Sequence, residues 1–178
     1  MKYLIFKVPF ENYSKWFKEI SVLMFILYFI KTKNCNYRIT EIEFYYYSKN
    51  HKDETTYGFA KNMNKLPERI QRLKKAQCDP LTWFFHYSGI DLVIGKEDEP
   101  GGILIRGIEN IRTKEKLRGP LVVLLELLNQ QIDIGGNKAL QIEVVPNNNE
   151  FQFELVVSKR VGLGIGNFED ALYSFSTK

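Results

Sequence analysis

The stretch 39–47, with the sequence ITEIEFYYY, is the feature that most constrains the fold of this chain. It is apolar and aromatic apart from a threonine and two glutamates, and side chains alternate between the two faces of a β-strand. A strand here places two sets of side chains on opposite faces: Thr40, Ile42, Phe44 and Tyr46 on one, and Glu41, Glu43, Tyr45 and Tyr47 on the other. The pattern therefore predicts a strand that carries a carboxylate between two tyrosines on one face.

Glu43 has two interpretations on this strand. The strand alone favours a solvated position, because Glu is seldom buried unpaired. The alternative is a partly desolvated acid, whose raised pKa would suit it to proton chemistry. A nearby cation would bear on this choice, and Arg106 is the only cation in the apolar run 101–108. The residues alone favour a Glu43–Arg106 ion pair that holds two strands in register and needs no substrate.

Length and composition indicate one globular domain over residues 1–178, expected to be monomeric. A chain of 178 residues with 44% hydrophobic and 14% aromatic content can bury a sizeable core. The formal charge of +4, from 25 basic and 21 acidic residues, favours anionic partners mildly and permits nucleic acid. Cys35 and Cys78 lie far apart without a CxxC motif, so the sequence predicts no metal site and favours two free thiols in a reducing compartment over a disulfide between them.

The sequence predicts a cytoplasmic protein with no membrane partner. The densest apolar run, 22–30, is far shorter than the roughly 20 residues needed to cross a bilayer. The amino-terminal region does not resemble a signal peptide, because charged residues interrupt it and no small-residue cleavage pattern follows.

Hydrophobic periodicity and turn residues predict the elements of the first half. Aromatic and apolar residues three and four apart predict an amphipathic helix over Glu11–Ser21. Branched and aromatic residues predict a buried strand over Leu23–Ile30, which the turn Lys33–Asn36 would join to the Glu43 strand as a hairpin. A short helix could open at Leu66–Ile70.

The second half predicts mainly strands. One is expected over Leu81–Ile94, interrupted near Ser88 and Gly89, and another over Ile103–Ile108. Pro120 fits the first turn of an almost wholly buried helix. The remaining predicted strands are a hairpin of Leu140–Val145 with Phe151–Val157, and a last strand at Ala171–Phe175. Helices and strands mix without regular alternation, so we expect an α+β fold with a mainly antiparallel curved sheet and a few packed helices.

Four segments, in this order, resemble motifs of the alkyladenine (3-methyladenine) DNA glycosylase family. Arg38–Tyr45 is similar to the family's catalytic strand, and Gly102–Glu109 to the strand whose arginine helps to hold the attacking water. Gly119-Pro120 resembles the entry to the family's buried helix. Arg160–Gly164, ahead of an aromatic last strand, resembles the carboxyl-terminal motif whose backbone carbonyl completes the water site.

The resemblance implies a glycosylase-like fold and a function in base-excision DNA repair. The reaction would hydrolyse the N-glycosidic bond of an alkylated purine that has been flipped out of double-stranded DNA. It would need no metal or redox cofactor. By resemblance, Glu43 is the general base, Arg106 and the carbonyl of Val161 hold the water, and Tyr45 stacks on the base.

Several positions depart from the family's pattern. Tyr57 stands where the family has a histidine that contacts the flipped base, and Phe85 falls on an aromatic base-contact position. Ser88 stands where a tyrosine normally fills the vacated space in the duplex, and Tyr87 is one residue away. Gly95 replaces an asparagine that crowds out a purine amino group. These departures predict an altered substrate range, or a catalytically inactive nucleic-acid-binding or interaction protein that retains the fold.

Three further features are predicted to be structural. His86, within an aromatic strand, is interpreted as an edge or core residue. His51, in a charged loop, is expected to be solvated. The basic stretch 61–75 could follow a phosphate backbone, but a solvated helix face is the favoured interpretation.

Overall fold

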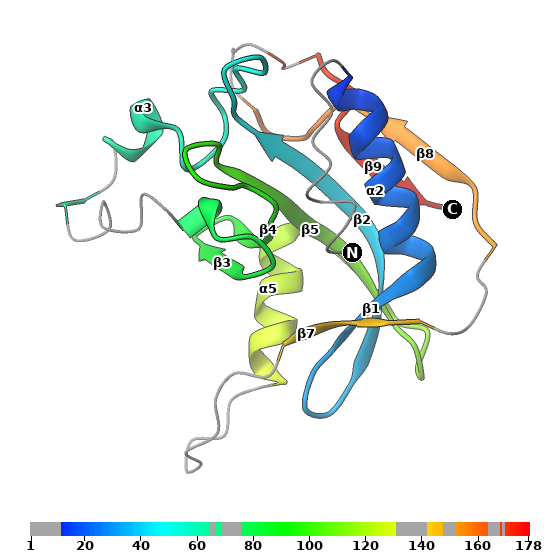
Figure 1. Ribbon diagram of the computed structural model, residues 1–178. Helices are drawn as coiled ribbons and strands as arrows, with labels where there is room; N and C mark the ends of the chain where they lie inside the picture. Colours follow the sequence, from blue (N-terminus) through cyan, green and yellow to red (C-terminus); the bar gives the residue numbers. More distant parts are fainter. Residues whose placement is uncertain are drawn as a thin grey trace.

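The structure is a computed structural model that describes residues 12–64, 67, 68, 76–130, 142–147, 152–163, 168 and 170–178. Its elements in chain order are α2 (Tyr13–Leu27), β1 (Tyr28–Lys31), β2 (Asn36–Tyr46), α3 (Ala60–Met63), the short 3-10 helix η1 (Ala76–Cys78), β3 (Trp83–His86), β4 (Gly89–Val93), β5 (Gly101–Asn110), β6 (Lys116–Arg118), α5 (Pro120–Asn129), β7 (Glu143–Pro146), β8 (Leu155–Ser158) and β9 (Ser174–Thr177). Two long helices pack on one curled sheet, which confirms the predicted α+β class (Figure 1).

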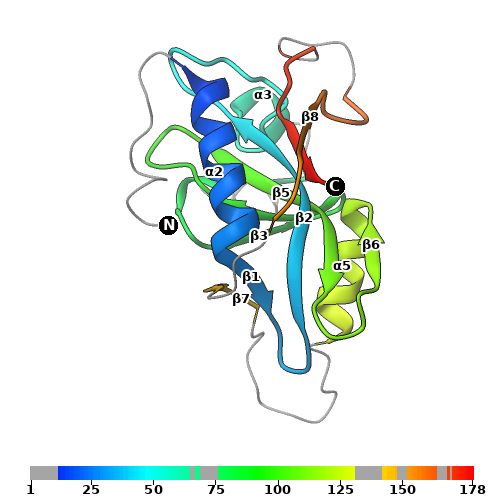
Figure 2. The same cartoon turned by 90° about the vertical axis from the view of Figure 1, so that its right-hand side faces the viewer.

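All the strands of the described residues belong to one antiparallel sheet. Its main path runs β3-β4-β5-β2-β1-β7, while β6 pairs with β5, β9 with β2, and β8 with β9. The long central strands β2 and β5 separate the two helices, with α2 on one side and α5 on the other (Figure 2). Because both of its faces are covered, β5 is buried along almost its whole length.

Helix α2 is longer than the sequence predicts. The side chain of Asn12 caps its first turn by accepting a 2.9 Å hydrogen bond from the backbone N–H of Lys15. Its buried side chains keep the helical spacing as far as Met24 and Phe25, so packing against β2 outweighs the β-propensity of the apolar run. The predicted strand over Leu23–Ile30 is therefore wrong before Tyr28, whereas the β1–β2 hairpin is confirmed.

Helix α5 begins at Pro120 as predicted, but it is not almost wholly buried. Leu121, Val122 and Leu125 are 51%, 46% and 51% exposed, because α5 packs through one face only, against β4 and β5. The core-facing side chains of α5 are Val123, Leu124 and Leu127.

The predicted carboxyl-terminal hairpin is also wrong. Strand β7 pairs with β1, far along the sheet, and β8 pairs with β9. The predicted last strand is confirmed as β9, although it begins at Ser174. Most of the predicted helix at 66–70 and much of the basic stretch 61–75 lie outside the described residues. Within the described residues, no helix combines the length and apolarity needed to cross a membrane.

Candidate functional site

The site lies on one face of the sheet where β2, β5 and β4 run side by side. Glu43 and Tyr45 lie two residues apart on β2 and therefore point to the same face. The register of β2 with β5 shifts between the pairs Glu41↔Gly107 and Ile42↔Ile105, which leaves Arg106 as the extra residue on β5. Such bulges re-aim a side chain, and here the guanidinium of Arg106 reaches both carboxylates of β2.

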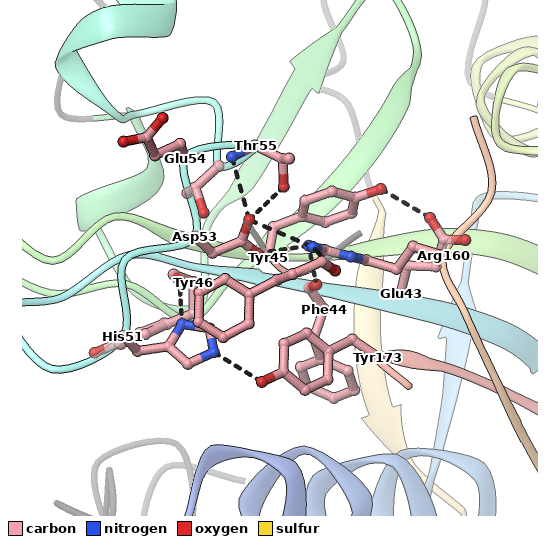
Figure 3. A network of polar contacts seen from close by, with 12 residues as sticks. Glu43, Phe44, Tyr45, Tyr46, His51, Asp53, Glu54, Thr55, Arg160 and Tyr173 are labelled. Atoms are coloured by element: carbon pink, nitrogen blue, oxygen red, sulfur yellow. Dashed lines mark hydrogen bonds and ion pairs between the residues drawn. The ribbon is translucent and has the colours of Figure 1, made fainter. Parts of the chain in front are cut away.

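Three donors surround the carboxylate of Glu43. Its Oε2 accepts a 2.8 Å hydrogen bond from the hydroxyl of Tyr45 (Figure 3). Its Oε1 accepts a 2.8 Å hydrogen bond from the backbone N–H of Val161 and lies 3.3 Å from Nη1 of Arg106. The Nε of Arg106 donates to Glu41 at 3.0 Å. The guanidinium therefore pairs with two carboxylates at once.

Glu43 is fully buried, so the solvated interpretation is wrong. Its burial raises the pKa of the carboxyl group, while the N–H of Val161, the guanidinium of Arg106 and the hydroxyl of Tyr45 act in the opposite direction. The predicted ion pair with Arg106 is present. The surroundings are those of a desolvated acid held by oriented donors, a state in which carboxyl groups can exchange protons nearer neutral pH.

A cavity of about 220 Å³ opens in front of this carboxylate. Aromatic, polar and small residues line it: Tyr45, Thr55, Tyr57, Gln77, His86, Tyr87, Ser88, Asp91, Leu104, Arg106, Pro120, Val161, Gly162 and Leu163. The structure thus brings together six of the predicted site residues, with Glu43 directly behind three of them, Tyr45, Arg106 and Val161. Among the described residues, no group of three or more His, Cys, Asp and Glu could hold a metal ion.

Val161 takes part in the site through a different backbone group from the one the resemblance implies. Its N–H donates to Glu43, whereas the resemblance assigns a carbonyl that holds water. Val161 is 60% exposed and lines the cavity, while its backbone N–H touches the buried carboxylate.

Phe85 and Gly95 lie outside the set of residues that line the cavity. Phe85 alternates with Phe84 and His86 along β3, and since His86 faces the cavity, Phe85 faces the other side and is 40% exposed. A Cβ on Gly95 would lie 1.9 Å from the backbone oxygen of Gln77, so close backbone packing accounts for this glycine.

The β3–β4 hairpin carries the predicted intercalating residues at its tip. His86 pairs with Gly89, so Tyr87 and Ser88 form the two-residue turn. Tyr87 is 81% exposed, the highest value among the exposed large hydrophobic side chains of the described chain, and Ser88 is only partly exposed. Both line the cavity, and of the two, Tyr87 projects from the rim.

An ion pair behind Tyr45 was missed by the sequence analysis. The side chains of Arg160 and Asp53 are fully buried and pair with each other (Figure 3). Arg160 also donates to the backbone oxygens of Phe44, at 3.0 Å, and Phe168, at 3.2 Å. Its guanidinium carbon lies 4.7 Å from the centre of the Tyr45 ring, a cation–π contact. The pair spans 107 residues of sequence, so no local pattern reveals it.

His51 is buried, not solvated as predicted. Its Nδ1 bonds to the backbone oxygen of Tyr46 at 2.7 Å, and its Nε2 bonds to the hydroxyl of Tyr173 at 2.9 Å (Figure 3). Because the Tyr46 oxygen can only accept, the hydrogen lies on Nδ1. The ring stacks against Phe168, and burial lowers the pKa of His51.

His86 lies on β3, the edge strand of the sheet's main path, as predicted, and its side chain also lines the cavity. Its Nε2 lies 3.1 Å from Oδ1 of Asp91, and Gln77 donates from Nε2 to Oδ2 of Asp91 at 2.7 Å. The sequence analysis missed Asp91 and Gln77. Strand alternation across the two-residue turn could have placed His86 and Asp91 on one face, but Gln77 lies on a separate element.

Comparison of the chain with models of protein families, with curated proteins and with solved structures found no match. Its function is therefore inferred from the chemistry of the site.

Proposed function

We propose that this protein is a base-excision DNA glycosylase that hydrolyses the N-glycosidic bond of an alkylated purine flipped out of duplex DNA. The observation that carries this proposal is the buried carboxylate of Glu43, which Arg106, Tyr45 and the N–H of Val161 hold behind an aromatic cavity. An extruded base needs an aromatic pocket, and the bond to its sugar needs an oriented base that activates water.

The proposed reaction is a hydrolysis in which Glu43 is the general base. As the bond between C1′ and the purine nitrogen breaks, its electron pair leaves with the purine. Water attacks C1′ and gives a proton to the carboxylate of Glu43. A carboxylate can accept about four hydrogen bonds. The three donors already present orient the carboxylate and leave one lone pair for the water. The products are a free purine and an abasic site.

The walls of the cavity fit the handling of a base. The rings of Tyr45 and Tyr57 offer flat faces on which a base can stack. Tyr87, 81% exposed at the hairpin tip, is available to enter the space that the flipped nucleotide leaves in the duplex. The formal charge of +4 adds a mild attraction for the phosphate backbone.

A second candidate is a nucleic-acid-binding module that recognises a flipped base without cleaving its bond. This candidate is favoured by the burial of Glu43, which lies behind the cavity and is not one of its lining residues. In such a module the Glu43–Arg106 pair would hold β2 and β5 in register and make no contact with water.

Base release from a methylated duplex oligonucleotide separates the two candidates. The glycosylase releases a free purine and leaves an alkali-labile abasic site, whereas the binding module leaves the strand intact over a long incubation with several lesions. Fluorescence anisotropy at low and high salt measures binding of the protein to the same duplex. Salt-sensitive binding without release selects the module, and no binding even at low salt excludes both.

A further inference from the structure

A second buried carboxylate, Asp91 of β4, lies across the site from Glu43. Glu43 pairs with Leu104 on β5, and Leu104 pairs with Asp91, so the three residues form one row across three strands. Partners in neighbouring strands face the same side of a sheet. Two strand spacings separate the backbones of Glu43 and Asp91 by about 10 Å. Leu104 lies between them and lines the cavity, as Asp91 does.

The carboxylate of Asp91 is held in place by neutral groups. Gln77 donates to one oxygen at 2.7 Å, and Nε2 of His86 contacts the other at 3.1 Å. The N–H of Ser88 donates to Nδ1 of His86 at 3.3 Å, so the ring hydrogen lies on Nε2 and points at Asp91. A neutral imidazole satisfies both contacts. His86 therefore orients Asp91 without cancelling its charge.

Gly102 makes room for this carboxylate beside Tyr45. A Cβ on Gly102 would lie 2.5 Å from Oδ2 of Asp91, and Gly102 is the partner of Tyr45 in the register of β2 with β5. The charge of Asp91 thus lies close to the aromatic walls. Burial is the main cause that raises the pKa of both Tyr45 and Tyr57, and the charge of Asp91 adds to it in each case.

Among the described residues around the cavity, negative charge exceeds positive charge. Glu41 and Glu43 share the single guanidinium of Arg106, while the buried Arg160–Asp53 pair is balanced within itself. Asp91 has no Lys or Arg partner among the described residues, and its side chain is only 3% exposed. Two of its roughly four acceptor positions are used, so it can accept further hydrogen bonds from a ligand. A weakly solvated carboxylate attracts a cation much more strongly than one in water does.

We propose that Asp91 is a specificity-determining residue that selects a positively charged base, such as an N-alkylated purine cation, over a neutral base of the same shape. This inference rests on the proposed function and adds to it the charge of the base that the site prefers. In the row Glu43–Leu104–Asp91, the proposed substrate binds with its sugar bond toward Glu43 and the far side of its ring system toward Asp91.

The test compares two duplexes that differ in the charge of one base. One contains 7-methylguanine, a cation when joined to its sugar, and the other contains 7-methyl-7-deazaguanine, its neutral isostere. A 2′-fluoro sugar at that position in both duplexes blocks bond cleavage, so binding alone is measured. We expect the wild-type protein to bind the cationic duplex about tenfold more tightly or better. Asp91→Asn is expected to bring the two affinities together, and Asp91→Ser serves if the asparagine variant does not fold.

The outcomes separate this inference from the proposed function. Equal wild-type affinities for the two lesion duplexes, both above that for an undamaged duplex, overturn the role of Asp91 and leave lesion recognition intact. A preference that survives in a folded Asp91 variant assigns the selection to another group and also overturns the inference. Affinities no higher than for undamaged DNA, together with no base release from methylated DNA, overturn the proposed function itself.

Discussion

The backbone N–H of Val161 donates a 2.8 Å hydrogen bond to the carboxylate of Glu43 across 118 residues of sequence. The preceding residue, Arg160, is fixed by Asp53 and by the backbone of β2 at Phe44. Arg160 therefore anchors a carboxyl-terminal segment to β2, and the next residue of that segment contacts the acid of the central strand. The orientation of Glu43 depends on this segment as much as on its own strand.

The raised pKa of Glu43 should make the unfolding free energy of the protein depend on pH. The folded state binds this proton more tightly than the unfolded chain, whose glutamates titrate near 4.5. The stability contributed by Glu43 is thus fully present below that pH and is lost as the pH rises through the folded pKa. Urea unfolding of wild type and Glu43→Gln from pH 4 to 8 is expected to show the variant gaining relative stability as pH increases. A difference that does not change with pH contradicts the direction of the shift.

Removal of one partner of the Arg160–Asp53 pair should destabilise the fold strongly. Asp53→Asn leaves a buried guanidinium without its counter-charge, which typically costs about 3 to 5 kcal/mol of unfolding free energy. Glu54→Gln is the matched control, because Glu54 is the next residue and pairs with the exposed Lys61. The control is expected to have a urea midpoint near that of wild type. Equal midpoints for the two variants would show that the buried pair is dispensable.

Tyr87→Ala should weaken binding to a lesion-containing duplex without affecting stability. The side chain is 81% exposed, so its loss removes little packing, whereas the loss of an inserted aromatic side chain is expected to reduce duplex affinity about tenfold. Phe85→Ala, on the opposite face of β3, is the control and should bind as wild type does. Anisotropy titrations measure both. A larger effect at Phe85 than at Tyr87 would reverse the assignment of the two faces.

Acidification should destabilise the protein through His51. Burial lowers the pKa of His51, so the unfolded chain binds a proton near the ordinary value of 6.5 while the folded chain resists it. The stability contributed by neutral His51 is present above pH 6.5 and is lost as the pH falls toward the folded pKa. Nuclear magnetic resonance titration of the imidazole is the direct measurement. A titration midpoint above 6.5 would be the opposite of the expected shift.

Gly95→Asn should destabilise the fold. It should not change base selectivity, because Gly95 lies outside the residues that line the cavity. A Cβ at this position would meet the backbone of Gln77 at 1.9 Å, of Gly101 at 2.4 Å and of Glu99 at 2.6 Å. Overpacking of this kind costs about 1 to 3 kcal/mol or more. Thermal unfolding checks the stability, and Asp98→Asn is the control because Asp98 is an exposed residue of the same loop. A stable Gly95→Asn protein with altered base preference would place this glycine in the site after all.

Local patterns in the sequence were sufficient to predict the strands that carry the site. Alternation along 39–47 gave the correct faces for Glu43 and Tyr45, and the lone cation of 101–108 identified Arg106. The interruption predicted near Ser88 and Gly89 corresponds to the turn between β3 and β4. The apolar run 22–30 was ambiguous, since an uninterrupted apolar segment fits a buried helix as well as a strand. Only its packing against β2 decides between them.

The missed features depend on contacts between distant parts of the chain. Whether Glu43 is solvated depends on Val161 and Arg106, and neither is its neighbour in sequence. Asp53 and Arg160 each lie among other charged residues, and nothing in their spacing links them. The half-exposed face of α5 could not be foreseen from its composition, because the composition does not say how many sides of a helix the sheet covers.

The most direct test of the account is the single-turnover rate of purine release from a duplex containing one methylated purine. Wild type, Glu43→Gln and the control Glu54→Gln are compared after circular dichroism has established that each is folded. We predict that Glu43→Gln is slower by about 100-fold or more, the usual contribution of a general base, while Glu54→Gln keeps the wild-type rate. Equal rates for wild type and Glu43→Gln, or no release by the folded wild-type protein, would contradict the account.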